Sequence, residues 1–455
     1  MTVYGTAVYE TAERIGEMKF YGRQDEVAFL RRVRVESESH AQLTILKGRR
    51  RVGKTALLRQ AYGDRDFIYF FVARKSEADL CLDFQAELSR YFKIALPGTM
   101  RSFAEIFRYL LEVSEREPLT LVIDEFQDFL RIDASIFSTM QRDWDAHKDR
   151  AKMNLVVCGS INRMMEQIFS EDQPLYGRAT HEFRLDPFST DALKGVMSEC
   201  GATSDPDSLL ALWTLTGGVA KYVEVLVDGG AFDKEAMVSC FVSEGSVVPN
   251  EGKVLLVDEF RKDYGTYFSI LSLIASGRTS RGEIQNVIGS DVGGYLTKLC
   301  DDYGLVVKQR PFGDESSSRN MLYEIDDNFL RFWFRFVYRN QAAVEMKAYD
   351  RIRDLVLRDY AVFSGKALES YFAKKLAETG KWTQIGHWWD RKGENEIDLI
   401  AVDDLEKRIL FGEVKRSSER ISLGVLRGKA ESFLRAHSRY ATYAPDYQGF
   451  SLAEM

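Results

Sequence analysis

The sequence predicts an α/β protein, and three stretches of the chain carry that prediction. The first is GRRRVGKT at residues 48–55, which lies between an apolar run typical of a buried strand and an apolar helical pattern. The second is LTLVIDEF at 119–126, an apolar strand pattern that ends in two acids. The third is a pair of strand patterns, EIDLIAV at 396–402 and ILFGEVK at 409–415. We therefore expect a parallel-sheet core and, after a helical region, a second and smaller α/β domain.

Length and composition indicate a globular chain of several domains. At 455 residues there is room for about three domains with their own cores. The net charge of −7 excludes a globally basic nucleic-acid coat, so contacts with DNA must come from local patches. The scattered cysteines form no CxxC pair, which predicts neither a zinc site nor disulfides. Because we find no targeting segment and no long apolar run, we expect a cytoplasmic protein without a membrane partner.

The stretch at residues 48–55 has the composition of a phosphate-binding loop. Gly48 and Gly53 allow the backbone to turn its N–H groups toward phosphate oxygens, and the helix that follows adds its positive dipole end. Lys54 is placed to reach the β and γ phosphates, and Thr55 offers a hydroxyl to Mg²⁺. An ordinary glycine-rich turn between strand and helix is the alternative. We predict ATP and Mg²⁺ as cofactors, with nucleotide contacts from Gly48, Val52, Gly53, Lys54, Thr55 and Ala56.

The two acids after the apolar run at 119–123 are candidates for the chemistry of hydrolysis. Ligands of parallel sheets bind beyond the carboxyl ends of the strands, where Asp124 and Glu125 stand. Asp124 is placed to hold Mg²⁺ through its water shell. Glu125 is placed to polarise the attacking water as a general base. The alternative is a solvated strand end without a catalytic role.

Two later positions extend this candidate site. Ser160 follows another apolar strand pattern at 154–158, and a polar residue there can sense the γ-phosphate; the alternative is a helix N-cap. Arg178 lies on a loop at 174–178. An arginine on such a loop can stabilise transition-state charge in a neighbouring subunit, which would require a homo-oligomer. A surface salt bridge is the alternative for Arg178.

The order of motifs resembles that of a known family. Residues 20–26, with Gly22 and Arg23, resemble the adenine-side box of AAA+ ATPases and are expected to contact the nucleotide; the alternative is a helix cap with Arg23 and Glu26 on the surface. This box, GRRRVGKT, IDEFQ, CGS, LYGR and TGG together are similar to the archaeal and bacterial ATPase family within the AAA+/STAND group. The resemblance covers residues 18–230 and implies a P-loop core at 18–188 and a helical lid at 189–235. Relatives carry a proline shortly after the glycine pair, where this chain has valine and alanine, so contact of the lid with the base is in doubt.

The middle of the chain predicts a winged helix at residues 250–340. Helical patterns at 267–271, 280–284 and 294–299 precede two short strand patterns. The third helix would read DNA if the domain binds DNA. Residues 253–310 contain 8 basic and 7 acidic side chains, so charge does not decide between DNA and a protein contact. Arginines that recur every four residues mark one face of the next apolar helix: Arg331, Arg335 and Arg339.

The last part of the chain, 345–455, contains a second group of charged residues inside apolar strands. Glu413 and Lys415 are two positions apart and share a strand face, and a hairpin would bring Asp398 beside them. Asp398 and Glu413 could hold Mg²⁺ or Mn²⁺, and Lys415 could steady a phosphate. The spelling resembles the D…ExK centre of PD-(D/E)xK nucleases and implies a restriction-endonuclease-like α/β domain, with Glu369 as a further acid. The alternative is a surface hairpin.

Two functions remain open at this stage. The first is an ATPase that acts on or with DNA, in which nucleotide state controls the nuclease-like domain, in a mobile element or in defence. ATP hydrolysis would use Lys54, Thr55, Asp124 and Glu125. The second is a regulatory nucleotide switch that binds a protein partner and keeps the nuclease-like domain as an inactive scaffold. A basic excess at 407–439, with 9 basic and 3 acidic side chains, favours the first.

Overall fold

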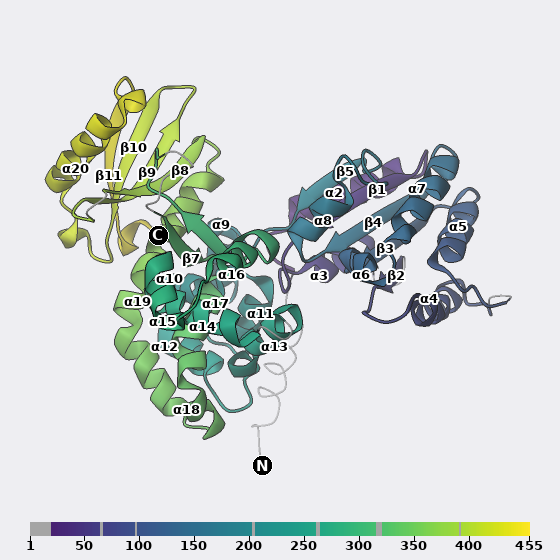
Figure 1. Ribbon diagram of the computed structural model, residues 1–455, viewed down its shortest axis with the longest axis horizontal. Helices are drawn as coiled ribbons and strands as arrows, with labels where there is room; N and C mark the ends of the chain where they lie inside the picture. The colour runs from purple at the N-terminus through teal and green to yellow at the C-terminus, as the bar shows by residue number, and fades with distance from the viewer. Residues whose placement is uncertain are drawn as a thin grey trace, which may run out of the picture. The chain divides into compact units, whose positions relative to one another are not determined.

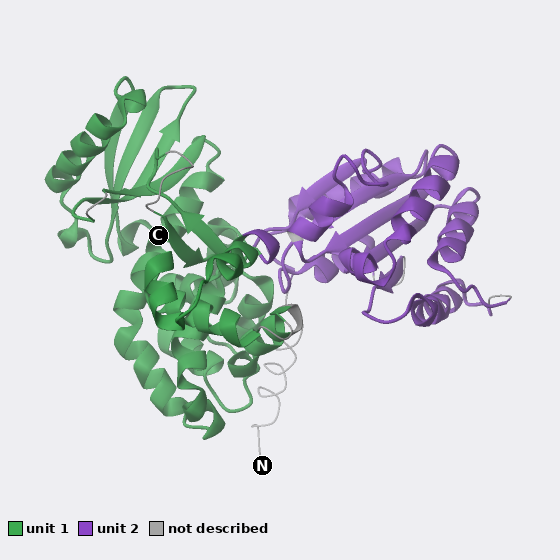
Figure 2. Cartoon of the chain, viewed as in Figure 1, with its two compact units in different colours: residues 1–19, 188–300, 304–455 green, residues 20–187, 301–303 purple. Residues whose placement is uncertain are grey.

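The chain forms two compact units, which are shown in different colours in Figure 2. Unit 2 comprises residues 20–187 with 301–303, and unit 1 comprises residues 188–300 and 304–455. The computed structural model describes residues 20–63, 67–95, 98–202, 205–260, 264–314, 321–390 and 393–455. Residues 1–19, in which we expected no targeting segment, lie outside the described residues.

Unit 2 is built on a parallel sheet of five strands in the order β2-β3-β4-β1-β5 (Figure 1). Every neighbouring pair in this sheet is parallel. The loop at 48–55 therefore follows a central strand, as an α/β nucleotide-binding sheet requires. The strands are β1 (Gln42–Lys47), β2 (Ile68–Phe71), β3 (Leu119–Asp124), β4 (Met153–Gly159) and β5 (His181–Arg184). The predicted parallel-sheet core is confirmed.

Helices cover both faces of this sheet, and the strands are apolar on both sides for that reason. On β3, Val122 packs with α2 and α3, whereas Leu121 and Ile123 pack with α4, α5 and α7. Successive side chains of a strand point to opposite faces, so one apolar run supplies two cores. The helices are α2 (Gln24–Glu36), α3 (Lys54–Tyr62), α4 (Glu77–Phe92), α5 (Phe103–Ser114), α6 (Phe129–Ile132), α7 (Ser135–His147) and α8 (Asn162–Ile168).

Unit 1 begins with helices that surround one fully apolar helix, α10. Residues 208–216 of α10 are all buried, which is expected of a helix in the centre of a bundle. The indole of Trp213 donates to the carbonyl of Ala367 on α19 at 3.0 Å. The helices are α9 (Thr190–Glu199), α10 (Pro206–Thr216), α11 (Ala220–Asp228), α12 (Lys234–Phe241) and α13 (Val248–Phe260). The residues for which we predicted a lid thus pack against the long helix α19 (Tyr349–Glu378).

Three helices and a β-hairpin follow, the arrangement of a winged helix. The hairpin pairs Val306 with Ile325 and Gln309 with Leu322 in antiparallel register. An aromatic helical segment (residues 328–337) then leads into α19. It is buried along one side, with Phe332 and Phe334 inaccessible to solvent. The elements are α14 (Tyr264–Ala275), α15 (Arg281–Ile288), α16 (Gly293–Thr297), β6 (Val306–Gln309), β7 (Leu322–Ile325), α17 (Asn328–Phe332), a π-helical turn (Trp333–Val337) and α18 (Gln341–Glu345).

The carboxyl-terminal domain is a sheet in the order β11-β10-β9-β8 with a helix on each face. The pairs β8/β9 and β9/β10 are antiparallel, and β10/β11 is parallel. Phe433 of α20 packs on one face, and Phe372 of α19 contacts Phe450 on the other. The elements are β8 (Gln384–Trp389), β9 (Glu396–Asp403), β10 (Arg408–Val414), α20 (Leu423–Ala436) and β11 (Ala444–Phe450). The predicted hairpin is β9 and β10.

This domain is joined to the helices at the start of unit 1 by polar contacts. Arg416, just after β10, donates to the hydroxyl of Ser364 on α19 at 2.7 Å and to Asp207 on α10 at 2.5 Å. Glu378 at the end of α19 accepts from the Thr190 hydroxyl at 2.6 Å. These bonds connect the end of β10 with α10 and α19, and α19 with α9.

Two further features concern the whole described chain. The cysteines Cys81, Cys158, Cys200, Cys240 and Cys300 are all free thiols. In the part of the chain that the structure describes, we find no helix with the length and apolar character needed to cross a membrane.

Candidate functional site

The loop after β1 owes its shape to its two glycines. A Cβ on Gly48 would lie 2.8 Å from the Leu185 carbonyl oxygen, so only glycine fits there without displacement. Gly53 has φ of 100° and caps α3, a conformation that side chains disfavour. Lys54 opens α3 and folds back over the loop, where its ammonium group donates to the carbonyls of Gly48 at 2.5 Å and Arg49 at 3.3 Å. The loop thus encloses a lysine at a helix N-terminus, the arrangement that phosphate binding requires.

The other predicted loop residues lie around this lysine. Val52 is buried in the core below the loop, whereas Ala56 is exposed on the first turn of α3. Thr55 is half-buried, and its side chain is close enough to Tyr69 of β2 to influence the pKa of that phenol. Its hydroxyl therefore stands on the side of the loop that faces the neighbouring strands.

Asp124 ends β3 with its carboxylate held by neutral donors. The Tyr69 hydroxyl donates to its Oδ2 at 2.6 Å, and the backbone N–H of Glu125 donates to its Oδ1 at 2.9 Å. Burial, and then the neighbouring Asp124 carboxylate, raise the pKa of Tyr69, so this phenol stays a donor at neutral pH. A carboxylate fixed in this way beside Thr55 is suited to a hydrated Mg²⁺, which prefers oxygen ligands and keeps several waters.

Glu125 lies in a small polar network just past β3. Its backbone has φ of 53°, in the left-handed region that is uncommon outside glycine. The Ser160 hydroxyl donates to Glu125 Oε2 at 2.7 Å, and the Gln127 amide donates to the same oxygen. Arg50 of the loop approaches Oε1 at 4.0 Å. The structure therefore brings Glu125, Ser160 and the loop together, and Ser160 acts through its hydroxyl on Glu125, whereas the N-cap of α8 is Ile161.

Gly22 and Arg23 lie at the same end of the sheet. Gly22 has φ of 57°, and the Arg23 guanidinium donates to the Asp186 carbonyl and to Glu26 at 2.9 Å. Asp186 follows Leu185, whose carbonyl packs on Gly48. The predicted adenine-side box is thus adjacent to the loop through β5.

Arg178 is directed elsewhere. Its guanidinium donates to Asp145 on α7 at 2.9 Å and to the Tyr176 carbonyl at 2.7 Å. The structure does not join it to Lys54, Asp124 or Glu125 within one chain. A contact with phosphate in this state needs the Asp145 ion pair to open.

The predicted carboxyl-terminal group does come together. Lys415 donates to Asp398 Oδ2 at 2.7 Å and lies 3.8 Å from Glu413 Oε1. The backbone N–H of Val414 also donates to Asp398, at 2.8 Å. Although burial opposes it, the Asp398 contact raises the pKa of Lys415, so the lysine is charged at neutral pH. Glu413 is buried at the end of β10 and accepts from the Ser422 N–H at 3.0 Å.

Glu369 on α19 extends this centre toward the winged helix. Its carboxylate lies 3.0 Å from Lys366, which is 3.4 Å from Glu324 on β7. Burial raises the pKa of Glu369 to about 7; Lys366 opposes this shift, and Asp398 adds to it. Acids on α19 and β9 therefore influence one another electrostatically.

This centre offers a metal ion fewer protein ligands than a dedicated metal site does. Among the described residues, no three His, Cys, Asp or Glu side chains are close enough to hold a metal. Asp398 and Glu413 would supply carboxylate oxygens to a hydrated Mg²⁺ or Mn²⁺, with water completing the shell. Such a cation would compete with Lys415 for Asp398.

Sequence reasoning did not find three side chains that these sites use: Tyr69, Gln127 and Lys366. Tyr69 reaches Asp124 because β2 pairs with β3, where Phe71 is level with Asp124. Gln127 was visible as part of IDEFQ, and its place just after the acids is a signal that could have been read. Lys366 pairs with Glu369 on the same helix and also with Glu324, which is remote in the chain.

Comparisons with known families match both ends of the chain. Residues 20–226 match the family described as an ATPase domain predominantly from Archaea. Residues 333–423 match a family of archaeal and bacterial proteins of unknown function. An uncharacterized protein of Methanocaldococcus jannaschii is 30% identical over 409 residues, which are 87% of this chain and 87% of that protein.

Two solved structures are similar in fold. One is a Walker-type ATPase of Pyrococcus abyssi, with a TM-score of 0.51, 20% identity, and coverage of 69% of this chain and 96% of that chain. The other is the ORC2 protein of Aeropyrum pernix in complexes with ADPNP and ADP, with a TM-score of 0.51, 14% identity, and coverage of 76% and 98%. At these identities the likeness establishes the fold.

Proposed function

We propose that this chain, which belongs to the ATPase family found predominantly in Archaea, hydrolyses ATP at the loop after β1 and acts on DNA through its carboxyl-terminal domain. The observation that carries the first part is the Glu125 network, which holds a carboxylate between Ser160 and the loop. In the proposed hydrolysis, Lys54 steadies the β and γ phosphates, and Glu125 polarises the attacking water. Ser160 orients Glu125. Mg²⁺, held through water by Thr55 and Asp124, would neutralise phosphate charge.

The action on DNA is supported by the Asp398, Glu413 and Lys415 group. The buried Glu413, the partly buried Asp398 and a charged lysine, gathered where β9 and β10 lie side by side, are suited to cleaving a phosphodiester with Mg²⁺ or Mn²⁺. We propose that nucleotide state controls this domain, through the contacts of Arg416 with α10 and α19. A role in a mobile element or in defence would fit such a protein.

A nicking assay tests this proposal. Supercoiled plasmid is incubated with the pure protein and Mg²⁺ or Mn²⁺, and then with Asp398→Ala and with the control Asp446→Ala, an exposed acid on β11. We expect nicking by wild type and by the control, and its loss in Asp398→Ala, with ATP turnover retained in all three. Absence of nicking, together with ATP turnover that DNA does not stimulate, would reject the action on DNA.

A second function is favoured by one observation, the internal satisfaction of both carboxylates. Asp398 accepts from Val414 and Lys415, and Glu413 accepts from Ser422. A centre satisfied in this way can be a scaffold, and the chain would then be a nucleotide switch that binds a protein partner. The result that rejects cleavage in the nicking assay supports this function.

We also propose that Arg178 acts on the nucleotide of a neighbouring subunit. Its pairing with Asp145 within the chain leaves a trans role dependent on assembly. Light scattering with ADP and with ATP, the latter on Glu125→Gln to prevent turnover, should show a larger assembly with ATP. A monomer in both conditions excludes the trans role.

A further inference from the structure

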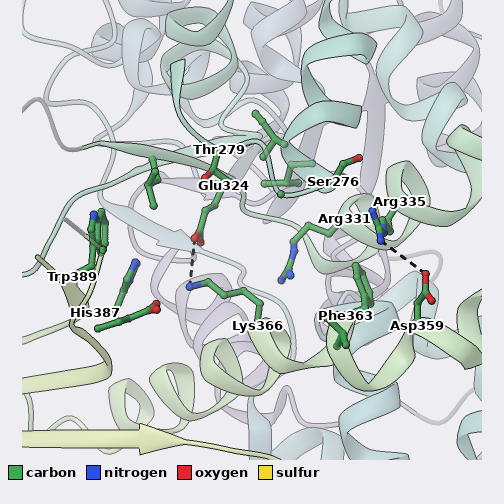
Figure 3. A pocket seen from close by; sticks show the side chains of 18 of the residues that line it. Ser276, Thr279, Glu324, Arg331, Arg335, Asp359, Phe363, Lys366, His387 and Trp389 are labelled. Atoms are coloured by element: carbon green, nitrogen blue, oxygen red, sulfur yellow. Dashed lines mark ion pairs between the residues drawn. The ribbon is translucent and has the colours of Figure 1, made fainter. Parts of the chain in front are cut away.

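Unit 1 contains a cavity that includes Lys366, which pairs with Glu369, but none of Asp398, Glu413 and Lys415. It has a volume of about 730 Å³ and is lined by the winged helix, the aromatic helical segment, α19 and the strands β8 and β9 (Figure 3). Ligand pockets for small molecules span roughly 300–1,000 Å³. The cavity therefore has room for a ligand of nucleotide size.

One part of the cavity is cationic. Arg331 and Arg335 line it from the aromatic helical segment, and Arg358 and Lys366 line it from α19. Asp359 pairs with Arg358 at 2.8 Å and lies 3.9 Å from Arg335. Lys366 pairs with Glu324 at 3.4 Å (Figure 3). Glu324 and Glu369 also act electrostatically on Arg331, but they do not form an ion pair with it.

Arg331 reaches into the space between Lys366 and Phe363 (Figure 3). Its contacts are the Asn328 side-chain oxygen at 3.4 Å and the Phe363 ring at 5.6 Å. No described carboxylate lies within ion-pair distance of it, and burial lowers the pKa of its guanidinium. A buried charge is costly without a charged partner, so an anion in the cavity would be stabilised at this position.

The other part of the cavity is aromatic. The rings of His387 and Trp389 on β8 are stacked, with centroids 4.7 Å apart and planes at 25°. Burial lowers the pKa of His387 to about 4, and Lys366 adds to this effect, so the histidine is neutral at pH 7 and forms an uncharged pair of rings with Trp389. Aromatic platforms of this kind stack nucleic-acid bases without sequence preference.

We propose that this cavity binds one nucleotide, with its phosphate at Arg331 and its base stacked on Trp389. Such a nucleotide is either free or part of a single nucleic-acid strand, and both present the same phosphate and base. This site is distinct from the loop after β1, since every residue named for it belongs to unit 1. It goes beyond the proposed function, because it does not depend on ATP hydrolysis or on cleavage by Asp398.

Binding to the full chain tests the inference. Every sample, including the reference protein, carries Lys54→Ala so that the loop after β1 does not contribute, and ADP is left out because it would compete for the cavity. The first probe is a fluorescein-labelled single strand of about ten nucleotides, whose binding is measured by fluorescence anisotropy. The second is thymidine 5′-monophosphate, whose binding is measured by calorimetry. The variants are Arg331→Gln and Trp389→Leu. The matched control is Arg351→Gln, an exposed arginine of α19 that does not line the cavity.

We expect each variant to bind at least about tenfold more weakly than the reference protein, since loss of one stacked base or charged contact has that size. The control should stay within about twofold. If the variants lose binding of both probes, the ligand is a free nucleotide. If they lose binding of the labelled strand alone, the ligand is a nucleic-acid strand. Binding of both probes by both variants at the affinity of the reference protein overturns the inference, and so does failure of the reference protein to bind either probe.

Two checks keep the outcomes separate. If Arg331→Gln has a lower melting temperature, Trp389→Leu on β8 decides the result. Asp398→Ala should retain binding here even if it abolishes nicking. A failure of the nuclease proposal therefore leaves this inference standing, and the converse also holds.

Discussion

The two candidate sites place acids at strand ends but balance their charge differently. In unit 2, Asp124 and Glu125 accept from neutral donors, namely Tyr69, Ser160 and Gln127. In unit 1, Asp398 accepts directly from the charged Lys415 at 2.7 Å. Apart from Arg50, which lies 4.0 Å from Glu125, no described cation pairs with these two acids, and we expect them to act on a cation that arrives with the substrate. The second carries its own cation, which any metal would have to displace.

This difference teaches where each site draws its electrostatic energy. Ion pairs in partly buried positions repay their desolvation only when geometry is good, and the Lys415 ammonium provides such geometry to Asp398. We therefore expect the unit 2 site to depend on its ligand and the unit 1 centre to be stable without one. Four measurements sharpen that contrast, beginning with the largest expected effect.

The largest effect should come from Lys54→Ala. It removes the cation that lies inside the loop, so ATP turnover should fall by about a hundredfold or more. Arg59→Ala, an exposed position on the same helix, should retain turnover. Steady-state phosphate release measures both. Turnover in Lys54→Ala within a few-fold of wild type would place ATP hydrolysis elsewhere.

Glu125→Gln should lower turnover by about a hundredfold and leave ATP binding intact, because general bases contribute about 10² or more to rate. Glutamine keeps the volume and can still contact Ser160. Glu117→Gln, an exposed acid just before β3, is the control. Phosphate release and nucleotide titration separate the two effects. Loss of binding together with turnover would mean that Glu125 supports the loop and is not a base.

The pH dependence of stability should differ between wild type and Glu369→Gln. The folded-state pKa of Glu369 is raised from 4.5 to about 7, so the folded chain binds more protons in this window than the unfolded chain. Its contribution is full below pH 4.5 and is lost as pH rises toward 7. Wild type should lose about 1–3 kcal/mol relative to Glu369→Gln over this range.

Urea denaturation at several pH values measures the difference in the free energy of unfolding between the two proteins. His387 contributes the opposite pH dependence to both proteins, so its contribution cancels in this difference. Glu431→Gln, an exposed acid on α20, should follow wild type. Parallel curves for wild type and Glu369→Gln would show that Glu369 is ionised alike in both states.

The smallest effect should come from Tyr69→Phe. It deletes one neutral hydrogen bond to Asp124, which is worth about 1 kcal/mol, so the Mg²⁺ concentration for half-maximal turnover should change by about fivefold. Tyr176→Phe, on an exposed ring, is the control. An unchanged Mg²⁺ dependence would separate Tyr69 from the metal function of Asp124.

The elements and the acids at their ends could be predicted from sequence because both depend on local pattern. The apolar run before Asp124 predicted a buried strand, and β3 ends at Asp124. Likewise, the two-residue spacing of Glu413 and Lys415 predicted a shared face, and both lie beside one another. Strand periodicity is a property of neighbours in the chain.

Contacts between remote segments could not be predicted in the same way. Tyr69 contacts Asp124 only because β2 pairs with β3, and sequence patterns do not specify strand order. The cavity is a stronger example, since Arg331 was expected to lie on one face with Arg335 but nothing local indicated that Trp389 would share that space. Distant pairs are decided by packing, which a single sequence does not display.

The connection of Arg416 has a mechanical consequence. Arg416 follows Lys415 by one peptide bond and is tied to Asp207, near the start of α10, and to Ser364 on α19. Because residues 208–216 of α10 are all buried, we expect α10 to shift as one body. Such a shift would pull on the backbone next to Lys415 and change the distance between Lys415 and Asp398. The distance from the Lys415 ammonium group to Asp398 would then depend on the position of α10. The electric field at the end of β10 would change with that distance.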